Sequence, residues 1–416
     1  MSEDFSDEGM TRGSDRLEKV KVNSSEVRLG MFVCELDRPW LMTPFPLQGF
    51  EIRTVQDISR VQEYCRYVYI DVRRTGSKPA LSGMPQTPTI AIGEAIAPRE
   101  EFKVADVVTA RTGKLIQGYV ENIHQGTAID IQMAREAVAA CVGTVLRNPQ
   151  AILCIAQMRE KSDALSQHAM STCVYSIIVG RALGLAGKDL ETLGTAALLH
   201  DMGKVSVPEE VLGKAGPLGL EEYALVKQHA KFGRETLLGG LKTDDRVAEV
   251  AYSHHERLDG SGYPRGLRGS ELDIACRIVA AAEKYEALTS IRPHRPAYTH
   301  LDAMNVVNRM VKRGHVDEMV VNHFFTYLGT YPPGTVVELS DGEKAIVLET
   351  NPNQRLRPII LVVRDRENNP VTRFVDMALR KTDESGKPYR VRHVLTPAAA
   401  GINLLDYREL VIQTLA

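Results

Sequence analysis

Histidines and one acidic residue form an unusual group in the middle of this sequence. Five of the eleven histidines fall between positions 168 and 255, namely His168, His200, His229, His254 and His255. The last two are adjacent, and Asp201 directly follows His200. Neutral imidazoles together with a carboxylate suit borderline divalent metals. Because a carboxylate has two oxygens that two ions can share, the pattern predicts a metal site with room for a pair of ions.

Two neighbouring metal ions suit phosphodiester hydrolysis. They deprotonate a water at neutral pH and neutralise the charge that develops on the phosphate. A single histidine is more often structural or superficial than a ligand, so no one residue carries this prediction. The set of five, with its two adjacent pairs, does carry it, but on its own it predicts a metal site and not a particular enzyme.

Helices are expected to position these side chains. Residues 100–330 show helical spacing, as in the apolar stripe formed by Val306, Val307, Met310 and Val311. We expect helices near residues 101–125, 130–147, 161–184, 188–200, 220–238, 243–256, 273–289, 302–313 and 317–328. Each of the five histidines lies in one of these stretches or at its end. The middle of the chain is therefore predicted to be an all-helical domain, residues 100–330.

The flanking segments have a different character. Residues 1–15 are polar and predicted to be a disordered tail. Residues 16–75 contain short β-rich runs and one helical stretch, TVQDISRVQEYC, so a small α+β module is expected there. A Pro-, Gly- and Ser-rich linker is expected over residues 76–99. After residue 330 the runs TVVELS, KAIVLET and PIILVVRD predict a small β-rich extension, residues 331–416, packed on the helical domain.

Composition excludes several classes of protein. The chain of 416 residues is 44% hydrophobic and 25% charged, with a formal net charge of −2, so a long nucleic acid is not an expected partner. No apolar stretch approaches the roughly 18 residues of a membrane span, and the acidic N-terminus is unlike a signal peptide. The six cysteines are widely spaced and predicted to be reduced. A cytoplasmic protein is expected.

Three consecutive stretches resemble a known family. They are LLHDMGKVSVPEEVL, LEEYALVKQHAKFGRETL and the long run from HHERLDGSGYP to SIRPHR. Between His168 and Arg295 the order, the spacing and the residue types are together similar to the HD-GYP family, including the triplet Gly262-Tyr263-Pro264. The first 75 residues resemble the small domain that often precedes HD-GYP domains. The resemblance implies a metal-dependent phosphodiesterase that converts cyclic di-GMP to pGpG, and it leaves open whether the end product is pGpG or GMP.

The resemblance also implies a role for each matching residue. One metal would be bound by His168, His200, Asp201 and Glu283. Asp201 would bridge to a second metal, held by His229, His254 and His255. Lys204 would contact the scissile phosphate or orient the attacking water, so Asp201 and Lys204 are the predicted catalytic residues.

Substrate contacts are implied for the GYP loop and for two arginines. The glycines of this loop permit a tight backbone path near a ligand, and Tyr263 would either stack on a guanine or pack inside. Arg292 and Arg295 would grip phosphates, as guanidinium forks do. In the family the loop is also proposed to contact diguanylate cyclase (GGDEF) domains, and a homodimer is compatible with the sequence.

Two positions depart from the family pattern. Some members bind a third metal through a glutamate at the position of Ala164, which cannot ligate, so two metals per chain are predicted. The family's metal-binding aspartate is Glu283 here, whose extra methylene moves its oxygens by about 1.5 Å. Resemblance favours iron, with manganese next.

Two other functions compete with the phosphodiesterase. A general HD-type nucleotide phosphohydrolase would lack the GYP segment and the SIRPHR arginines. A non-catalytic cyclic di-GMP receptor or cyclase-binding module is favoured by Glu283 and opposed by the intact histidines and Asp201.

Overall fold

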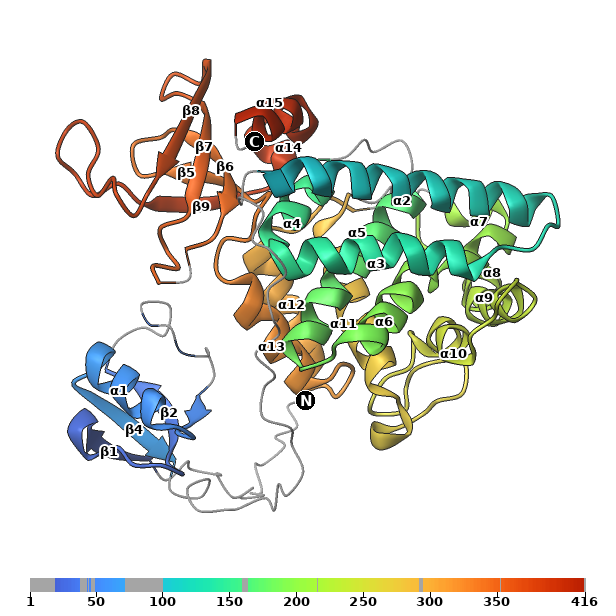
Figure 1. Ribbon diagram of the computed structural model, residues 1–416, viewed down its shortest axis with the longest axis horizontal. Helices are drawn as coiled ribbons and strands as arrows, with labels where there is room; N and C mark the ends of the chain where they lie inside the picture. Colours follow the sequence, from blue (N-terminus) through green and yellow to red (C-terminus); the bar gives the residue numbers. More distant parts are fainter. Residues whose placement is uncertain are drawn as a thin grey trace, which may run out of the picture. The chain divides into compact units, whose positions relative to one another are not determined.

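The computed structural model describes residues 19–37, 43, 45, 49–71, 100–158, 164–214, 216–291, 295–351 and 353–414. The chain divides into two compact units, residues 1–85 and 86–416 (Figure 1). The predicted tail, 1–15, and the predicted linker, 76–99, lie outside the described residues. The mainly helical fold class, with a small α+β module before it and a β-rich segment after it, is confirmed.

The first unit is a small antiparallel sheet with one helix. Its strands pair in the order β1-β4-β2-β3, and they are β1 (Lys19–Asn23), β2 (Phe32–Leu36), β3 (Phe50–Glu51) and β4 (Tyr67–Asp71). Helix α1 (Val55–Tyr64) is capped at its N-terminus by Thr54, which forms a capping box with Asp57. Val33, Val61 and Val68 are fully buried in the core between sheet and helix.

The helical domain occupies most of the second unit. Its first half contains α2 (Glu100–His124), α3 (Ile131–Arg147), α4 (Pro149–Gln157), α5 (Ala164–Ala182) and α6 (Gly187–Leu199). Its second half contains the 3-10 helix η3 (Met202–Ser206), α7 (Glu209–Leu212), α8 (Leu220–Lys227), α9 (His229–Leu238), α10 (Asp245–Ser253), the 3-10 helix η4 (Gly269–Glu271), α11 (Ile274–Thr289), α12 (His300–Lys312) and α13 (Glu318–Leu328).

Two of the helical expectations are corrected. Helix α4 was not expected, because residues 151–156 are all apolar and buried and so show no helical alternation. The single helix expected over 220–238 is two helices that meet at Gln228. The break follows from packing, because α9 buries several side chains whereas no residue of α8 is buried.

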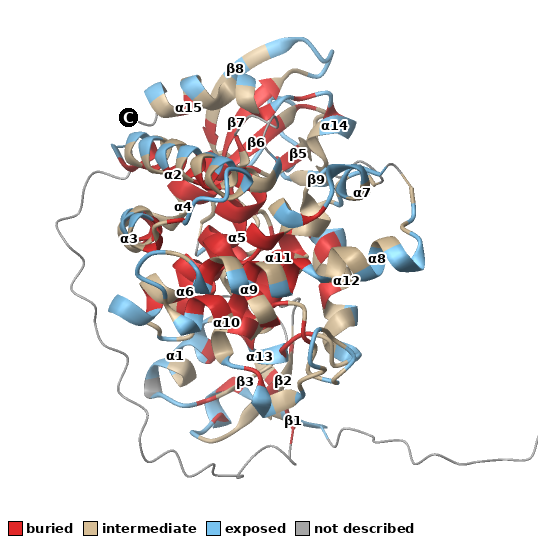
Figure 2. Ribbon diagram, turned by 90° about the vertical axis from the view of Figure 1, so that its right-hand side faces the viewer, coloured by how far each residue is buried: buried red, intermediate tan, exposed pale blue. Residues whose placement is uncertain are grey.

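Helix α5 lies at the centre of the domain. Every residue from His168 to Gly180 is buried, and α2, α3, α4, α6, α11 and α13 all contact it. Figure 2 shows α5 and α11 as the largest buried elements of the view. A helix that is apolar almost all round belongs inside a core. The one buried histidine of this helix, His168, is therefore held on a rigid element.

A five-stranded antiparallel sheet follows the helices. Its order is β8-β7-β6-β5-β9, formed by β5 (Val336–Leu339), β6 (Lys344–Glu349), β7 (Ile359–Arg364), β8 (Pro370–Asp376) and β9 (Val391–Leu395). One face, including Ile346 and Leu361, joins the helical core, and the other has a small core around Tyr389. Short helices end the described chain, namely α14 (Pro397–Ala400), the 3-10 helix η5 (Leu404–Tyr407) and α15 (Arg408–Thr414), which the sequence did not predict.

Within the described residues, no single helix is both long and apolar enough to cross a bilayer. One pair, α3 with α4, passes that test by length and composition, with a bend of 119° between the two helices.

Candidate metal centre

The predicted histidines and Asp201 meet inside the helical domain. The potential ligand atoms form two groups, and within each group all of the atoms lie within 4.8 Å of one another. The first group consists of His168, His200 and Asp201, and the second of Asp201, His229, His254 and His255. These groups match the two predicted metal sites, apart from Glu283. Asp201 belongs to both groups, as a bridging carboxylate would.

Helix ends bring these side chains together. His200 directly follows α6, His229 begins α9, and His254 and His255 follow α10, while His168 projects from the middle helix α5. The approach of η3 to α9 is very close, since a Cβ on Gly203 would lie 2.0 Å from the carbonyl oxygen of His229. A glycine is therefore required between Asp201 and Lys204 for Asp201 to reach His229.

Three imidazoles have a defined tautomer. The Nδ1–H groups of His200, His229 and His254 donate to the carbonyl oxygens of Ala197 (2.7 Å), Val226 (2.6 Å) and Ala251 (2.9 Å). Their Nε2 atoms face Asp201 at 3.5, 3.5 and 3.6 Å. A backbone carbonyl that fixes Nδ1–H leaves the Nε2 lone pair for a metal, which is the usual support of a ligating histidine.

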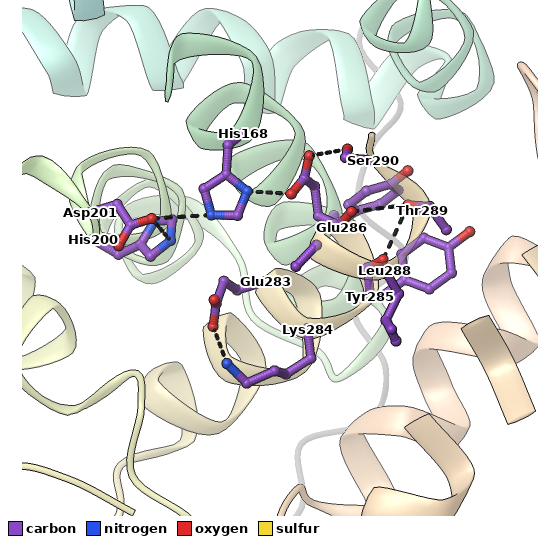
Figure 3. Close-up of polar contacts among 12 residues, drawn as sticks. His168, His200, Asp201, Glu283, Lys284, Tyr285, Glu286, Leu288, Thr289 and Ser290 are labelled. Atoms are coloured by element: carbon purple, nitrogen blue, oxygen red, sulfur yellow. Dashed lines mark hydrogen bonds and ion pairs between the residues drawn. The ribbon is translucent and has the colours of Figure 1, made fainter. Parts of the chain in front are cut away.

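His168 is held between two carboxylates. Its Nε2 lies 3.2 Å from Asp201 Oδ2, and its Nδ1 contacts Glu286 on α11 (Figure 3). Ser290 Oγ in turn donates to the other Glu286 oxygen. Burial disfavours the charged imidazole, but Glu286 and Asp201 outweigh it and raise the pKa of His168 to about 9. A carboxylate behind a ligating histidine orients the ring and raises its basicity.

Burial and neighbouring charges keep the remaining side chains of the site in the protonation states that bind a metal. Burial lowers the pKa of His200 to about 3 and that of His229 to about 4, and it holds the pKa of His255 well below its usual value. Burial opposes ionisation of Asp201, but Lys204 and the imidazoles hold the pKa of this carboxyl well below its usual range. Neutral imidazoles around an ionised carboxylate are the species that bind divalent metals.

The donor set fits a pair of metal ions. Among the described residues, His200 Nε2 and Asp201 Oδ1 are buried and have no hydrogen-bond partner. Buried polar atoms of native proteins are almost always satisfied, so two such atoms facing a common centre indicate a missing partner. A neutral imidazole nitrogen and an anionic carboxylate oxygen are both donors that suit a divalent cation.

Glu283 lies beside the two ligand groups and is a member of neither. Its carboxylate accepts from Lys284 Nζ at 2.9 Å and lies 3.7 Å from His255 Nδ1, and it belongs to neither of the two ligand groups found in the described part of the chain. Burial opposes its ionisation, but Lys284 and the imidazoles hold the pKa of Glu283 well below its usual range. It is an ionised carboxylate beside the centre, on the side of His255.

The GYP loop lies against the second ligand group. The Tyr263 ring packs on His255 with 4.8 Å between ring centroids and an interplanar angle of 34°, and a cis peptide bond joins it to Pro264. Burial raises the pKa of the Tyr263 hydroxyl. A Cβ on Gly262 would lie 2.4 Å from Arg257 N, so only glycine fits where the loop passes its own start.

Lys204 and the predicted arginines differ in how far the structure describes them. Lys204 Nζ donates to Asp201 Oδ2 from η3. Arg295 donates through Nη2 to the carbonyl oxygen of Ala287 at 2.5 Å, while its buried Nη1 has no partner within the described ranges. Arg292 lies outside the described residues. Ala164, where some relatives of the family have a third-metal glutamate, begins α5.

Two supporting residues were missed at the sequence level. Glu286 lies three residues after Glu283, and this helical spacing was the available signal that both face the same side of α11. Glu256 is buried and accepts from the backbone nitrogens of Arg265 (2.7 Å) and Leu267 (3.1 Å), which closes the GYP loop. No spacing in the sequence distinguishes Glu256 from an exposed glutamate.

Family comparisons agree with this arrangement. An HD domain model matches residues 153–320, and a "domain of unknown function (DUF3391)" model matches residues 19–134, which extends into α3.

Curated relatives extend the comparison beyond the domain. A cyclic di-GMP phosphodiesterase of Pseudomonas aeruginosa is 32% identical over 352 residues, 82% of this chain and 84% of that protein. A 3′3′-cGAMP-specific phosphodiesterase of Vibrio cholerae is 38% identical over 160 residues, 38% of this chain and 37% of its own length. A cyclic di-GMP phosphodiesterase response regulator of Xanthomonas campestris is 43% identical over 123 residues, 29% of this chain and 32% of its own length.

Proposed function

Because the chain belongs to the HD-GYP family of HD-domain phosphodiesterases, we propose that it hydrolyses the bacterial second messenger cyclic di-GMP. The products would be pGpG and, in a second cleavage, GMP. The observation that carries this proposal is a single buried carboxylate, Asp201, shared by two groups of histidines.

Two divalent ions bound in these groups would supply Lewis acidity and activate water at neutral pH. Resemblance to the HD-GYP family favours iron, with manganese next, and imidazole and carboxylate donors are compatible with both. His168, His200 and Asp201 would hold one ion, and Asp201, His229, His254 and His255 the other. Glu283 would join the first ion only after its carboxylate leaves Lys284.

The chain's own residues would then orient and stabilise the substrate. Asp201 faces His168 and His200 with Oδ2 and His229 and His254 with Oδ1, so each oxygen serves one group. Lys204, already beside Oδ2, would place its ammonium on the scissile phosphate and offset the charge that develops in the transition state. Arg295 has one buried guanidinium nitrogen left to bind a phosphate oxygen.

The choice of cyclic di-GMP rests on the relatives. Those from Pseudomonas aeruginosa and Xanthomonas campestris are named for this substrate, whereas the Vibrio cholerae relative is named for 3′3′-cGAMP. Of the three relatives compared above, the Pseudomonas protein matches over most of both chains. The small α+β module predicted over residues 16–75 would then have a regulatory or partner-binding role, and the GYP loop would be a contact for GGDEF domains.

One experiment tests the proposal. Protein purified anaerobically is analysed for metals, and the same sample is incubated with cyclic di-GMP and, separately, with 3′3′-cGAMP while products are separated by chromatography. About two metals per chain with pGpG or GMP formed faster than the cGAMP products would support the proposal. Faster cleavage of 3′3′-cGAMP would replace the substrate but keep the reaction.

The second candidate function is a non-catalytic receptor. It is favoured by the pairing of Glu283 with Lys284, which keeps a predicted metal ligand outside both groups. Tight binding of cyclic di-GMP without turnover, in protein that contains two metals, would support the receptor and contradict the enzyme.

A further inference from the structure

Helix α8 is an unusual neighbour for a metal centre. The structure describes all of its residues, none of them is buried, and the Tyr223 side chain is 47% exposed. The helix ends two residues before His229, a member of the second ligand group. Large apolar side chains this exposed do not stabilise the core, so a role in binding is the alternative to examine.

Lys227 connects this helix to the metal centre. Its Nζ lies 5.1 Å from the centroid of the Tyr223 ring and 5.8 Å from that of the Tyr263 ring. Tyr263 in turn packs on His255. The four side chains therefore form a continuous row from solvent to the second ligand group, in the order Tyr223, Lys227, Tyr263 and His255.

Aromatic rings interleaved with an ammonium group suit a nucleotide. A base stacks on an aromatic face whatever its sequence identity, and an ammonium binds phosphate as a point charge. A cyclic dinucleotide has two phosphates and two bases, of which only one phosphate can occupy the metal centre in a given cleavage. The remaining half of the substrate needs a second surface close by, with affinity for a base and an anion.

We propose that Tyr223 and Lys227 form this second surface, a nucleotide subsite outside the metal centre. The Tyr223 ring stacks on one base, and the Lys227 ammonium binds the phosphate that is not being cleaved. This inference rests on the proposed function and deepens it, because it places substrate recognition on α8. An occupant of the subsite also covers the exposed aromatic surface of a helix that contributes nothing to the core.

The test compares Tyr223→Ala with two matched variants of the metal-loaded protein. Loss of one base stack predicts a rise of about 5- to 150-fold in the KM for cyclic di-GMP, with a much smaller change in kcat. Tyr223→Phe keeps the ring and should restore the wild-type KM. Leu220→Ala removes an exposed side chain from the same helix outside the row, and it should behave as wild type.

Lys227 is tested separately through its charge. Lys227→Met should raise the KM and flatten its dependence on salt concentration, whereas Lys227→Arg should retain both. Metal content and thermal stability are measured for every variant, because a displaced α9 would change both. Equal KM values for Tyr223→Ala, Leu220→Ala and the wild type would overturn the subsite.

Failure of the proposed reaction remains distinguishable from failure of the subsite. If the wild type binds cyclic di-GMP without cleaving it, the same variants are compared by their Kd in calorimetric titrations. A 5-fold or larger rise in Kd for Tyr223→Ala alone would then support the subsite while the reaction is rejected. Absence of both binding and turnover in the metal-loaded wild type would overturn the two together.

Discussion

The Glu286 carboxylate contacts Nδ1 of His168, while the opposite ring nitrogen, Nε2, lies 3.2 Å from Asp201 (Figure 3). The imidazole therefore bridges two helical segments, α11 on one side and the turn after α6 on the other. Among the described histidines of the two ligand groups, His255 also has a carboxylate near a ring nitrogen, since its Nδ1 lies 3.7 Å from Glu283. The other fixed Nδ1 atoms of the groups donate to backbone carbonyls.

Glu286→Gln should weaken metal binding roughly 10- to 100-fold, because the amide neither raises the basicity of His168 nor fixes its ring as a carboxylate does. Competition with a chelator, followed by elemental analysis, measures this effect. Glu318→Gln, an exposed position in the first turn of α13, is the matched control and should bind metal normally. Unchanged affinity in Glu286→Gln would show that the contact is only structural.

Asp201→Asn should remove most metal binding and lower activity by roughly 100-fold or more, beyond the loss from a supporting residue. The variant keeps the shape of the side chain but removes the charge that two histidine groups and Lys204 surround. Metal content and product formation are measured on one sample. Retention of two metals would contradict the bridging role.

Glu283→Asp should preserve or raise kcat, by up to roughly 10-fold, because it restores the shorter carboxylate of the family pattern. The shorter side chain also draws its oxygens away from Lys284, which now contacts Glu283 at 2.9 Å. Steady-state kinetics and metal content measure the effect, with Glu318→Asp as the control. Complete loss of activity would sink the interpretation of Glu283 as an imperfect ligand.

The sequence predicted most of the helices because their apolar periodicity is strong, whereas the division of the histidines into two ligand groups came from the resemblance to the HD-GYP family. Apolar periodicity marks most helices, and paired histidines at helix ends mark the centre. Helix α4 was missed because its buried residues, 151–156, have no polar face. Contacts that depend on tertiary packing were also missed. Glu286 contacts His168, 118 positions away in the sequence, and Lys227 on α8 lies over the ring of Tyr263 in the GYP loop.

Glu283 illustrates the limit of position-by-position transfer from a family. Its position on α11 agrees with the pattern, but the orientation of its carboxylate depends on Lys284 beside it. The Lys284 ammonium can pair with the Glu283 carboxylate in place of a metal ion. The spacing of residues in the sequence does not indicate which of the two the carboxylate binds. The positions of the histidines were predictable because backbone carbonyls fix their ring nitrogens. The orientation of the flexible Glu283 side chain was less predictable.

The folded protein should lose stability in mild acid through His300, which belongs to neither ligand group. His300 is buried, accepts from the Tyr285 hydroxyl at 2.8 Å through Nδ1 and donates to the carbonyl oxygen of Gly329 at 3.0 Å. Burial lowers its pKa from 6.5 to about 4. Between these pH values the unfolded chain holds a proton that the folded chain lacks, so the free energy of unfolding falls as the pH falls.

The shift corresponds to a loss of about 3 kcal/mol between pH 7 and pH 4, absent from a variant without this imidazole. Denaturant unfolding of metal-free protein at several pH values measures it, with His300→Gln as the comparison, because the glutamine can still accept from Tyr285. The ligand-group histidines titrate in both proteins and cancel in the difference. The variant should be less stable at pH 7 but should lose less stability on acidification. Parallel pH profiles for the two proteins would contradict a neutral, buried His300.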